Sequence, residues 1–314
     1  MKKEIHEEVL QAFSPPSSEE NNVTIEALGG GLINHTYKIS ASNTAPFLLQ
    51  RINKYVFPNP QEVQENYIHI WQYAEFEFTG LRLPAPRYCG RMTTLFVDRD
   101  ENYWRAFEFI NDAEMRNIAT KPEQAGATAK AFARFTASFE DFNVELLQKV
   151  IPGFHNLSLR YQQFEEALKG EYYERISKSL SLIQQLKERE RYKHFYEIIT
   201  ESDQFPLRVM HHDAKISNVL FNQKNGRVIC PIDFDTVMPG YFFSDLGDMI
   251  RSMACCRDEN SIEFDELCIR KDYYEAIVNN YLSVMENQFT FGEKNYIHYA
   301  GLLMTYMQSL RFLT

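Results

Sequence analysis

The segment His211-His212-Asp213-Ala214-Lys215-Ile216-Ser217-Asn218 restricts the fold and chemistry of this chain more than any other stretch. An apolar run follows it, and after a turn comes Ile232-Asp233-Phe234-Asp235. Phosphoryl transfer needs a carboxylate that positions the attacking hydroxyl and accepts its proton, together with oxygen ligands that hold Mg²⁺ against the phosphates. The spacing H-x-D-x-x-x-x-N, followed by a strand, a turn and a second Asp, supplies all of these groups.

Two of these oxygen-bearing residues are predicted to lie side by side across a hairpin. Asn225-Gly226 separates the two apolar runs, and Asn-Gly is the preferred two-residue hairpin turn. With this turn at the tip, Asn218 faces Asp233, and cross-strand partners have Cα atoms about 4.5 to 5.5 Å apart. The same register places Pro231 at a hydrogen-bonded position where it has no N–H to give, which predicts a break or bulge in the ladder.

Each of these residues also has an ordinary structural explanation. A single aspartate such as Asp213 is commonly a helix or turn cap. The joint pattern of spacing, strand, turn and second Asp is much harder to obtain by chance, so a functional role is predicted for Asp213, Asn218 and Asp233. His211 is predicted to be structural, because a histidine this close to a base usually packs and hydrogen-bonds to hold its loop.

The order of predicted elements indicates an α+β chain. Alternating apolar residues predict strands over residues 24–28, 33–39, 47–52, 87–98 and 103–110, and helical spacing predicts one helix over residues 61–76. Beyond residue 111 the pattern is mainly helical, with two short strands near residues 219–233. This change predicts an N-terminal lobe, residues 1–110, and a C-terminal lobe, residues 111–314.

Composition limits the classes of partner. Hydrophobic residues make up 44% of the 314 residues and charged residues 24%, which predicts a packed globular core. The formal net charge of -10 argues against nonspecific binding to nucleic acid or to an anionic membrane. No stretch approaches the roughly 18 apolar residues of a membrane-spanning helix, and residues 1–10, which no apolar run follows, are not expected to form a secretory signal.

The cysteines indicate a reducing compartment. There are five of them, Cys89, Cys230, Cys255, Cys256 and Cys268, with no CxxC pair. An odd number without such a pair predicts reduced thiols in a cytoplasmic protein. The final helical pattern also still continues at Leu310 and Leu313 without a stop signal, from which we expect that the natural chain is longer.

These motifs resemble the aminoglycoside phosphotransferase and choline kinase superfamily, and within it the N-acetylhexosamine 1-kinases. The similar segments are residues 31–37, 49–53, 211–218, 232–240 and 310–314. The resemblance implies a protein-kinase-like, two-lobed α+β fold, with an N-terminal antiparallel sheet plus helix and a mainly helical C-terminal lobe. It also implies ATP and Mg²⁺ as cofactors and a small molecule as substrate.

Transferred residue by residue, the resemblance implies Asp213 as the base and Asn218 and Asp233 as the Mg²⁺ ligands. Arg51 matches the family's basic residue that touches the ATP phosphates, although an ordinary surface arginine is the alternative. Glu65 is its implied ion-pair partner, and Glu62, one helical turn away, is the competing choice.

The remaining implied contacts concern the nucleotide and the sugar. Gly29, Gly30 and Gly31 would let the backbone approach the phosphates, because glycine tolerates positive φ. Glu108 and Ile110 belong to the segment whose backbone would meet adenine. Asp235, Asp248 and Arg311 are the candidates for the sugar site, although helix capping would also explain Asp245 and Asp248.

The sequence therefore predicts transfer of the γ-phosphate of ATP to a hydroxyl of a small molecule, preferably the anomeric hydroxyl of an N-acetylhexosamine. A kinase of an amino alcohol or aminoglycoside is the nearest alternative; the net charge of -10 is compatible with a cationic substrate, and Arg311 opposes one. An inactive kinase-like binding module is a second alternative, and such modules usually lose the base or a metal ligand.

Overall fold

The computed structural model describes residues 5–14, 23–29, 33–42, 44–77, 79–90, 93–170, 172–257 and 261–314. Gly30 and Gly31 of the predicted phosphate-binding turn lie outside these ranges. The chain separates into two compact units, residues 1–113 with 146–150 and residues 114–145 with 151–314. The predicted assignment of nucleotide binding to residues 1–110 and of catalysis to residues 111–314 stays a prediction.

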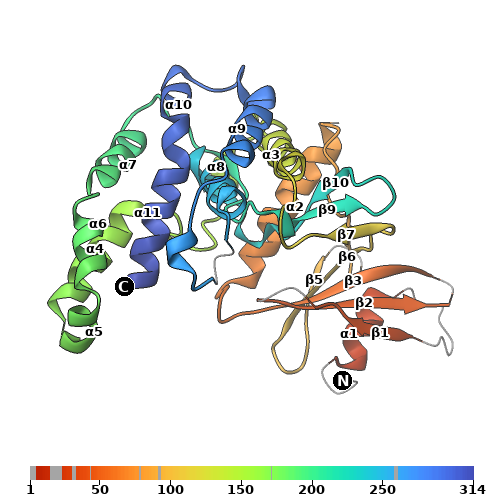
Figure 1. Cartoon of the computed structure of the whole chain (residues 1–314). Coiled ribbons are helices and arrows are strands. Elements are labelled where there is room, and N and C mark those ends of the chain that lie inside the picture. Colours follow the sequence, from red (N-terminus) through yellow and green to blue (C-terminus); the bar gives the residue numbers. More distant parts are fainter. Residues whose placement is uncertain are drawn as a thin grey trace. The chain divides into compact units, whose positions relative to one another are not determined.

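The first unit is built on an antiparallel sheet with the strand order β1-β2-β3-β6-β4, in which β5 also pairs with β6 (Figure 1). Its elements are α1 (Glu7–Phe13), β1 (Thr24–Ala27), β2 (His35–Ala41), β3 (Thr44–Ile52), α2 (Pro60–Phe76), β4 (Pro86–Arg87), β5 (Leu95–Val97) and β6 (Tyr103–Glu108). The prediction of one strand over residues 87–98 is wrong, because the chain turns back at Gly90, whose φ is +73°, and pairs Cys89 with Thr93.

The two faces of this sheet carry different helices. Along β3, Phe47 and Leu49 point to one face, where they form a buried cluster with Val9 and Phe13 of α1. The opposite face carries α2, whose Tyr67 ring meets the Phe107 ring edge-on at 5.1 Å. Because side chains alternate along a strand, this arrangement decides which β3 residues can reach α2.

The second unit is mainly helical. Its helices are α3 (Pro122–Ala137), α4 (Leu157–Lys169), α5 (Tyr173–Lys178), α6 (Leu180–Lys187), α7 (Arg191–Glu201), α8 (Phe243–Met249), α9 (Lys271–Met285), α10 (Phe291–Tyr296) and α11 (Ala300–Leu313). Its short strands are β7 (Ala113–Met115), β8 (Arg208–Met210), β9 (Val219–Asn222), β10 (Val228–Pro231) and β11 (Met238–Gly240). They form the ladder β10-β9-β7 and the pair β11-β8.

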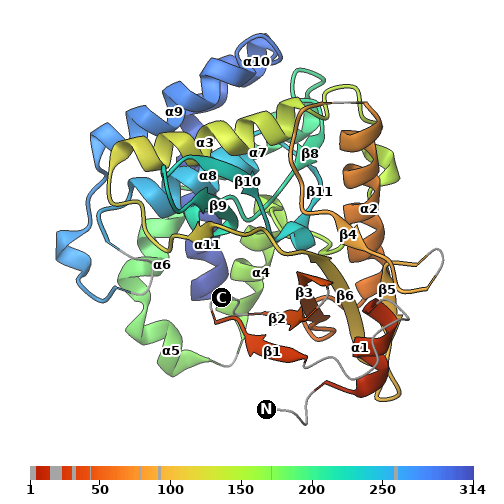
Figure 2. The same cartoon turned by 90° about the vertical axis from the view of Figure 1, so that its right-hand side faces the viewer.

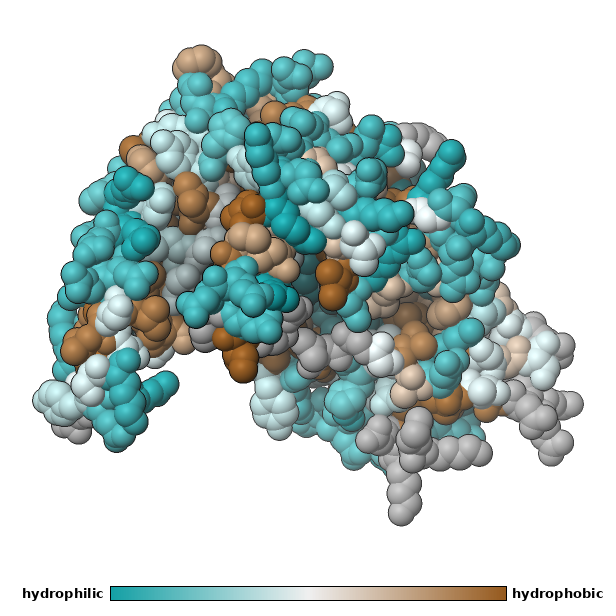
Figure 3. All heavy atoms as spheres, in the orientation of Figure 1, coloured by the Kyte–Doolittle hydropathy of each residue, from teal (hydrophilic) through white to brown (hydrophobic). Residues whose placement is uncertain are grey.

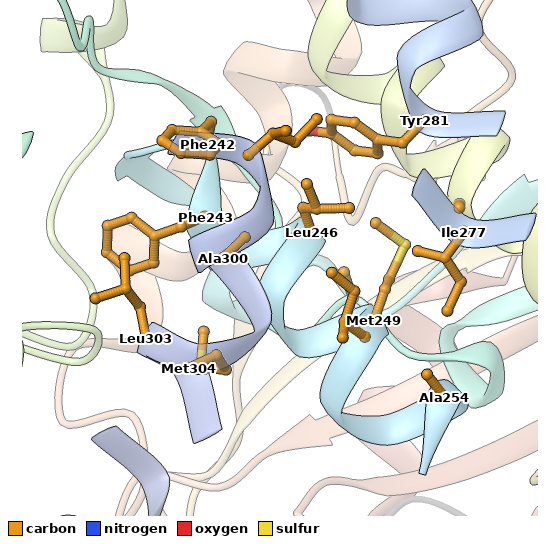
Figure 4. Close-up of a cluster of buried hydrophobic side chains, with 14 of the residues drawn as sticks. Phe242, Phe243, Leu246, Met249, Ala254, Ile277, Tyr281, Ala300, Leu303 and Met304 are labelled. Carbon is orange, nitrogen blue, oxygen red and sulfur yellow. The ribbon is translucent and has the colours of Figure 1, made fainter. Parts of the chain in front are cut away.

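Small residues bring the core helices of this unit close together. Helices α3 and α9 lie side by side in Figure 2, and a Cβ added at Gly126 of α3 would lie 3.2 Å from the Ala276 carbonyl of α9. A Cβ at Gly247 of α8 would lie 2.4 Å from the Ala300 carbonyl of α11. Figure 4 shows the result, with side chains of α8 packed between α9 and α11. Helix α8 is therefore held from two sides, which matters because it carries two buried carboxylates.

The face of the molecule drawn in Figure 3 is predominantly polar. Hydrophilic side chains cover most of the face in Figure 3, and hydrophobic ones occur in small, separate groups. Scattered hydrophobic residues of this kind are normal on proteins and need no special explanation. Among the described residues, no helix combines the length and the apolar character that crossing a membrane requires.

Candidate active site

The predicted catalytic loop lies between β8 and β9 and is held by a carboxylate of α8. Asp245 accepts backbone hydrogen bonds from His211 N at 2.9 Å (Oδ2) and from His212 N at 2.7 Å (Oδ1). It is completely buried, and burial raises the pKa of its carboxyl to about 7, although the two N–H groups act in the opposite direction. The helix-capping explanation of Asp245 is wrong for its side chain, which accepts from the backbone of His211 and His212 instead of capping α8.

His211 connects this loop to the end of β10. Its Nε2 donates to the Ile232 carbonyl at 2.9 Å, and its Nδ1 lies 3.4 Å from the Asp213 backbone N–H. The ring is fully buried against Phe132 and Phe234, and burial lowers its pKa. His211 is therefore a neutral ring whose two nitrogens both contact backbone groups.

Asp213 is oriented by two neighbours in the same segment. The Asn218 Nδ2 donates to the Asp213 Oδ2 at 2.7 Å and to the Asp213 carbonyl at 2.8 Å. The Lys215 Nζ lies 3.0 Å from the same Oδ2. In the described part of the chain, no donor is bonded to Oδ1, so this oxygen remains available to a bound molecule.

Lys215 was missed by the sequence reasoning, although it lies inside the motif. Burial lowers the pKa of its ammonium, but the carboxylates of Asp213, Asp248 and Asp233 outweigh burial, so the pKa is raised overall. Its position two residues after Asp213 is the feature of the sequence that could have indicated a role in the site. The charges of three predicted site carboxylates therefore all act on one ammonium group, that of Lys215.

The predicted hairpin register is wrong by one residue. The tip is a four-residue loop, because Asn222 N donates to the Arg227 carbonyl and Gly226 N to the Asn222 carbonyl, both at 2.8 Å. Gly226 adopts a φ of +66° in this loop. The loop is organised by the Asn222 side chain, which accepts from the backbone N–H groups of Lys224 and Asn225, and no two-residue turn forms.

The predicted bulge is confirmed and has a physical reason. The register shifts between Val228 and Cys230, so that Pro231 pairs with Val219. Ile232 N donates to the Asn218 carbonyl at 2.9 Å, which leaves Pro231 in a non-hydrogen-bonded pair where no N–H is needed. Asn218 thus faces Ile232, and Asp233 is the next residue.

Asp233 follows Ile232, which bonds to the Asn218 backbone, and Asn218 in turn donates to Asp213, the predicted base. Asp233 is exposed and has φ +64°, which turns the chain out of β10. Because Asn218 uses its Nδ2 on Asp213, its Oδ1 points elsewhere. Among the described residues, no group of three or more His, Cys, Asp or Glu side chains could hold a metal. The predicted metal site therefore consists of one amide oxygen and one carboxylate.

The predicted sugar residues all belong to the second unit. Asp248 pairs with Arg251 at 2.8 Å, and burial raises the pKa of its carboxyl to about 6 despite this pairing. Asp235 is buried in the short turn after Asp233. The Arg311 guanidinium lies 5.5 Å from the centre of the Phe154 ring. The Asp248 carboxylate helps to raise the pKa of Lys215, whereas the Arg311 guanidinium lies near the Phe154 ring.

His155, which stacks on Phe154, contacts His212 of the predicted catalytic loop. The sequence did not predict this contact. The Nδ1 atoms of His155 and His212 lie 3.2 Å apart, and the His155 ring stacks on Phe154 at 4.5 Å. Burial lowers the pKa of His212 to about 4 and that of His155 well below its ordinary value. Because 57 residues separate the two histidines, no local pattern could have found the pair.

In the first unit, the predicted ion pair of Arg51 is wrong. Arg51 pairs across the sheet with Trp104, whose ring centre is 5.9 Å from its guanidinium, on the face that carries α1. Neither Glu65 nor Glu62 of α2 forms an ion pair with it in the described ranges. Alternation along β3 explains this, since α2 covers the opposite face.

The face toward α2 carries other basic residues. Arg105 is 3% exposed and donates from Nε and Nη2 to the Gln50 Oε1 at 3.1 and 3.0 Å. The Lys38 Nζ lies 4.3 Å from the centre of the Phe109 ring. Of the residues predicted to meet adenine, Glu108 donates its backbone N–H to the Ala85 carbonyl, and Ile110 is buried. Arg105 and Lys38 were missed because sequence alone does not say which face α2 covers.

The comparisons with known proteins agree with this architecture. The model of the phosphotransferase enzyme family, APH, matches residues 24–273. An aminoglycoside 2'-phosphotransferase-IIIa in its GDP complex is 14% identical, with 98% of this chain and 89% of that chain covered and a TM-score of 0.55. A microcompartment-associated aminopropanol kinase is 15% identical, with 98% and 91% covered and a TM-score of 0.56. A Plasmodium vivax ethanolamine kinase is 15% identical, with 95% and 78% covered and a TM-score of 0.57.

The chain belongs to the phosphotransferase enzyme family, since the match covers more than half of its length. Its fold is the protein-kinase-like α+β fold that the resemblance implied, with an antiparallel sheet and helix in the first unit and mostly helices in the second.

Proposed function

We propose that this chain is a small-molecule kinase that transfers the γ-phosphate of ATP to a hydroxyl of its acceptor. The observation that carries the proposal is the environment of Asp213. One of its carboxylate oxygens is held by Asn218 and Lys215, and the backbone before it is held by Asp245. A carboxylate that is oriented through one oxygen and open at the other suits a group that positions a hydroxyl.

In this proposal, Asp213 accepts the proton of the acceptor hydroxyl through Oδ1. The acceptor oxygen forms a bond to the γ-phosphorus, the bond from that phosphorus to the bridging oxygen breaks, and ADP leaves. Lys215 holds a positive charge beside the base and is placed to stabilise negative charge on the transferring group. His211 keeps the loop attached to β10 and remains neutral.

The oxygen atoms of Asn218 and Asp233 fit a magnesium ion. Mg²⁺ is usually bound through one or two protein oxygens together with water and substrate phosphates, and few protein ligands are needed. A bound Mg²⁺ would neutralise phosphate charge at this position. Asn218 would then have two roles, with its Nδ2 orienting the base and its Oδ1 facing the ion.

Nucleotide contacts are proposed for the first unit. Gly29 with its two neighbouring glycines, Glu108 and Ile110 keep the roles that the family resemblance implies. For the phosphates, Arg105 and Lys38 are stronger candidates than Arg51, because they lie on the face that carries α2. A cytoplasmic location and the absence of nucleic-acid and membrane partners belong to the same proposal.

The preferred acceptor is an N-acetylhexosamine, which would be phosphorylated at its anomeric hydroxyl, with Asp235, Asp248 and Arg311 as contacts. The nearest alternative, an amino alcohol or an aminoglycoside, is cationic and needs unpaired acidic groups. Pairing of Asp248 with Arg251 removes one such group, which favours the neutral sugar. An inactive binding module is disfavoured, since Asp213, Asn218 and Asp233 are all present.

An acceptor panel tests this function. The chain is incubated with Mg·ATP and N-acetylhexosamines, amino alcohols or aminoglycosides, and products are identified by mass spectrometry. We expect the highest kcat/KM for an N-acetylhexosamine and no product from its methyl glycoside, which lacks the anomeric hydroxyl. A higher kcat/KM for a cationic acceptor would replace the sugar by the alternative, and no product from any acceptor would argue for a binding module.

Replacing Asp233 by Ala tests the metal role. We expect the Kd for Mg·ATP to rise by at least about 10-fold, because a ligand oxygen is removed. ATP binding in the presence of a chelator should not change, and Asp203→Ala, an exposed aspartate of the same unit, serves as control. Calorimetric titration measures both. An unchanged Kd for Mg·ATP would rule Asp233 out as a ligand.

A further inference from the structure

Two cysteines lie opposite each other on a short antiparallel ladder outside the site described above. The π-helical turn η4 (Ile250–Ala254) ends at Cys255, which pairs with Ile269 in an antiparallel bridge. Arg270 anchors the ladder on this turn, with its backbone N–H bonded to the Ala254 carbonyl at 2.8 Å. In this register, the next residues along the two segments, Cys256 and Cys268, face each other.

Backbone and side-chain contacts both join these two cysteines. Cys256 N donates to the Cys268 carbonyl at 3.0 Å, and Cys268 N donates to the Cys256 Sγ at 3.0 Å. Facing residues in such a pair have Cα atoms about 5.5 Å apart, and disulfides form at Cα separations of about 4.4 to 6.8 Å. The backbone therefore already has a geometry in which the two sulfur atoms can bond.

The other three cysteines do not share this geometry. Cys89 and Cys230 are buried. Cys255 precedes Cys256 in the extended segment, so its side chain points to the opposite side of the ladder. Cys256 is half-buried and Cys268 is exposed, so a small reagent can reach both. Only one pair of thiols in the described chain is thus both accessible and opposed.

The surroundings make Cys256 the more reactive thiol. A hydrogen bond from the Cys268 thiol lowers the pKa of Cys256, and backbone N–H groups and Arg257 act in the same direction. The pKa of Cys268 is raised by the same thiol contact. Arg257 is held near this position by ion pairs with Glu263, at 3.2 Å, and with Glu266. Thiolates are the nucleophiles in thiol oxidation, so attack begins at Cys256.

We propose that Cys256 and Cys268 form a redox modification site, at which a peroxide converts the two thiols into a reversible disulfide. The Cys256 thiolate attacks one peroxide oxygen, so that an S–O bond forms, the O–O bond breaks and hydroxide leaves. Cys268 then attacks the sulfenic sulfur, the S–S bond forms, and water carries away the sulfenic oxygen with the thiol proton. Sulfur supplies the two electrons that reduce the peroxide, and a dithiol reductant reverses the change.

Peptide mapping of the peroxide-treated chain tests the proposal. The reduced full-length chain is treated with hydrogen peroxide, remaining thiols are alkylated, and intact mass and peptides are measured. We expect a mass loss of about 2 Da per molecule before alkylation, a peptide that links Cys256 to Cys268, and full reversal by dithiothreitol. Cys255→Ser is the matched control and should form the same bond.

Cys268→Ser separates the two chemical steps. Without the second thiol, Cys256 should stop at the sulfenic acid, which dimedone traps as a stable adduct. Three outcomes would overturn the proposal: a bond that involves Cys255, a disulfide between two molecules on a non-reducing gel, or oxidation of Cys256 no faster than that of Cys255. The wild-type map decides the question even if a variant folds poorly.

Discussion

Replacing Asp213 by Asn is expected to lower the turnover number by roughly 10²- to 10⁴-fold, while Mg·ATP binding stays nearly unchanged. Asparagine has almost the same shape, and its side-chain oxygen can still accept from Asn218 and Lys215, which now hold the Oδ2 of Asp213. What the variant loses is the ability to accept the acceptor proton at Oδ1. The loss should therefore fall on kcat, with little change in the Kd of the nucleotide.

Steady-state ADP release and calorimetric binding of Mg·ATP measure these two quantities separately. Asp203→Asn is a suitable control, because this aspartate is exposed in the same unit. Turnover within a few-fold of the wild type would reject Asp213 as the base. A parallel loss of Mg·ATP binding would show that Asp213 contributes to the nucleotide site as well.

Replacing Asp245 by Ala is expected to lower the free energy of unfolding by about 2 to 6 kcal/mol. Two buried backbone N–H groups, of His211 and His212, would lose the carboxylate that accepts from them, and each unsatisfied group costs about 1 to 3 kcal/mol. Urea unfolding followed by circular dichroism measures this loss. Asp245→Asn keeps one acceptor oxygen and should lose about half as much.

The pH dependence of the Asn variant gives a second test of the same residue. Burial raises the pKa of Asp245 from about 3.9 in the unfolded chain to about 7 in the fold. The folded state then binds more protons between these values, so the contribution of Asp245 is complete below about pH 4 and is lost as the pH rises through 7. The stability difference between wild type and Asp245→Asn should shrink along this range. A difference that does not vary with pH would contradict the raised pKa.

The segment of residues 211–218 could be singled out from the sequence because the function proposed for it requires residues at fixed offsets in one stretch of chain. Asp213 and Asn218 are five residues apart, and the Asn218 side chain donates to both the carboxylate and the carbonyl of Asp213. Helix positions followed from apolar periodicity, as for α2, which was predicted over residues 61–76 and spans Pro60–Phe76. The predicted hairpin register is wrong, because Asn222 organises a loop longer than two residues and an extra residue forms a bulge in the ladder.

Contacts between remote segments could not be predicted in this way. Arg51 was paired with α2, but the first unit places α2 on the other face of β3, and a strand offers each side chain only one face. Asp245 was interpreted as a cap of its own helix, but packing of α8 against α9 and α11 directs its carboxylate to a loop more than thirty residues earlier.

The sequence by itself determined the α+β class, the helix positions and the segment that carries Asp213 and Asn218, because each of these depends on neighbours within a few residues. The tertiary structure alone decided which face of the sheet meets α2, which carboxylate holds the loop before Asp213, and that His155 meets His212 and Cys256 meets Cys268. These outcomes depend on how helices and ladders pack, and packing joins residues whose separation along the chain leaves no local pattern to read.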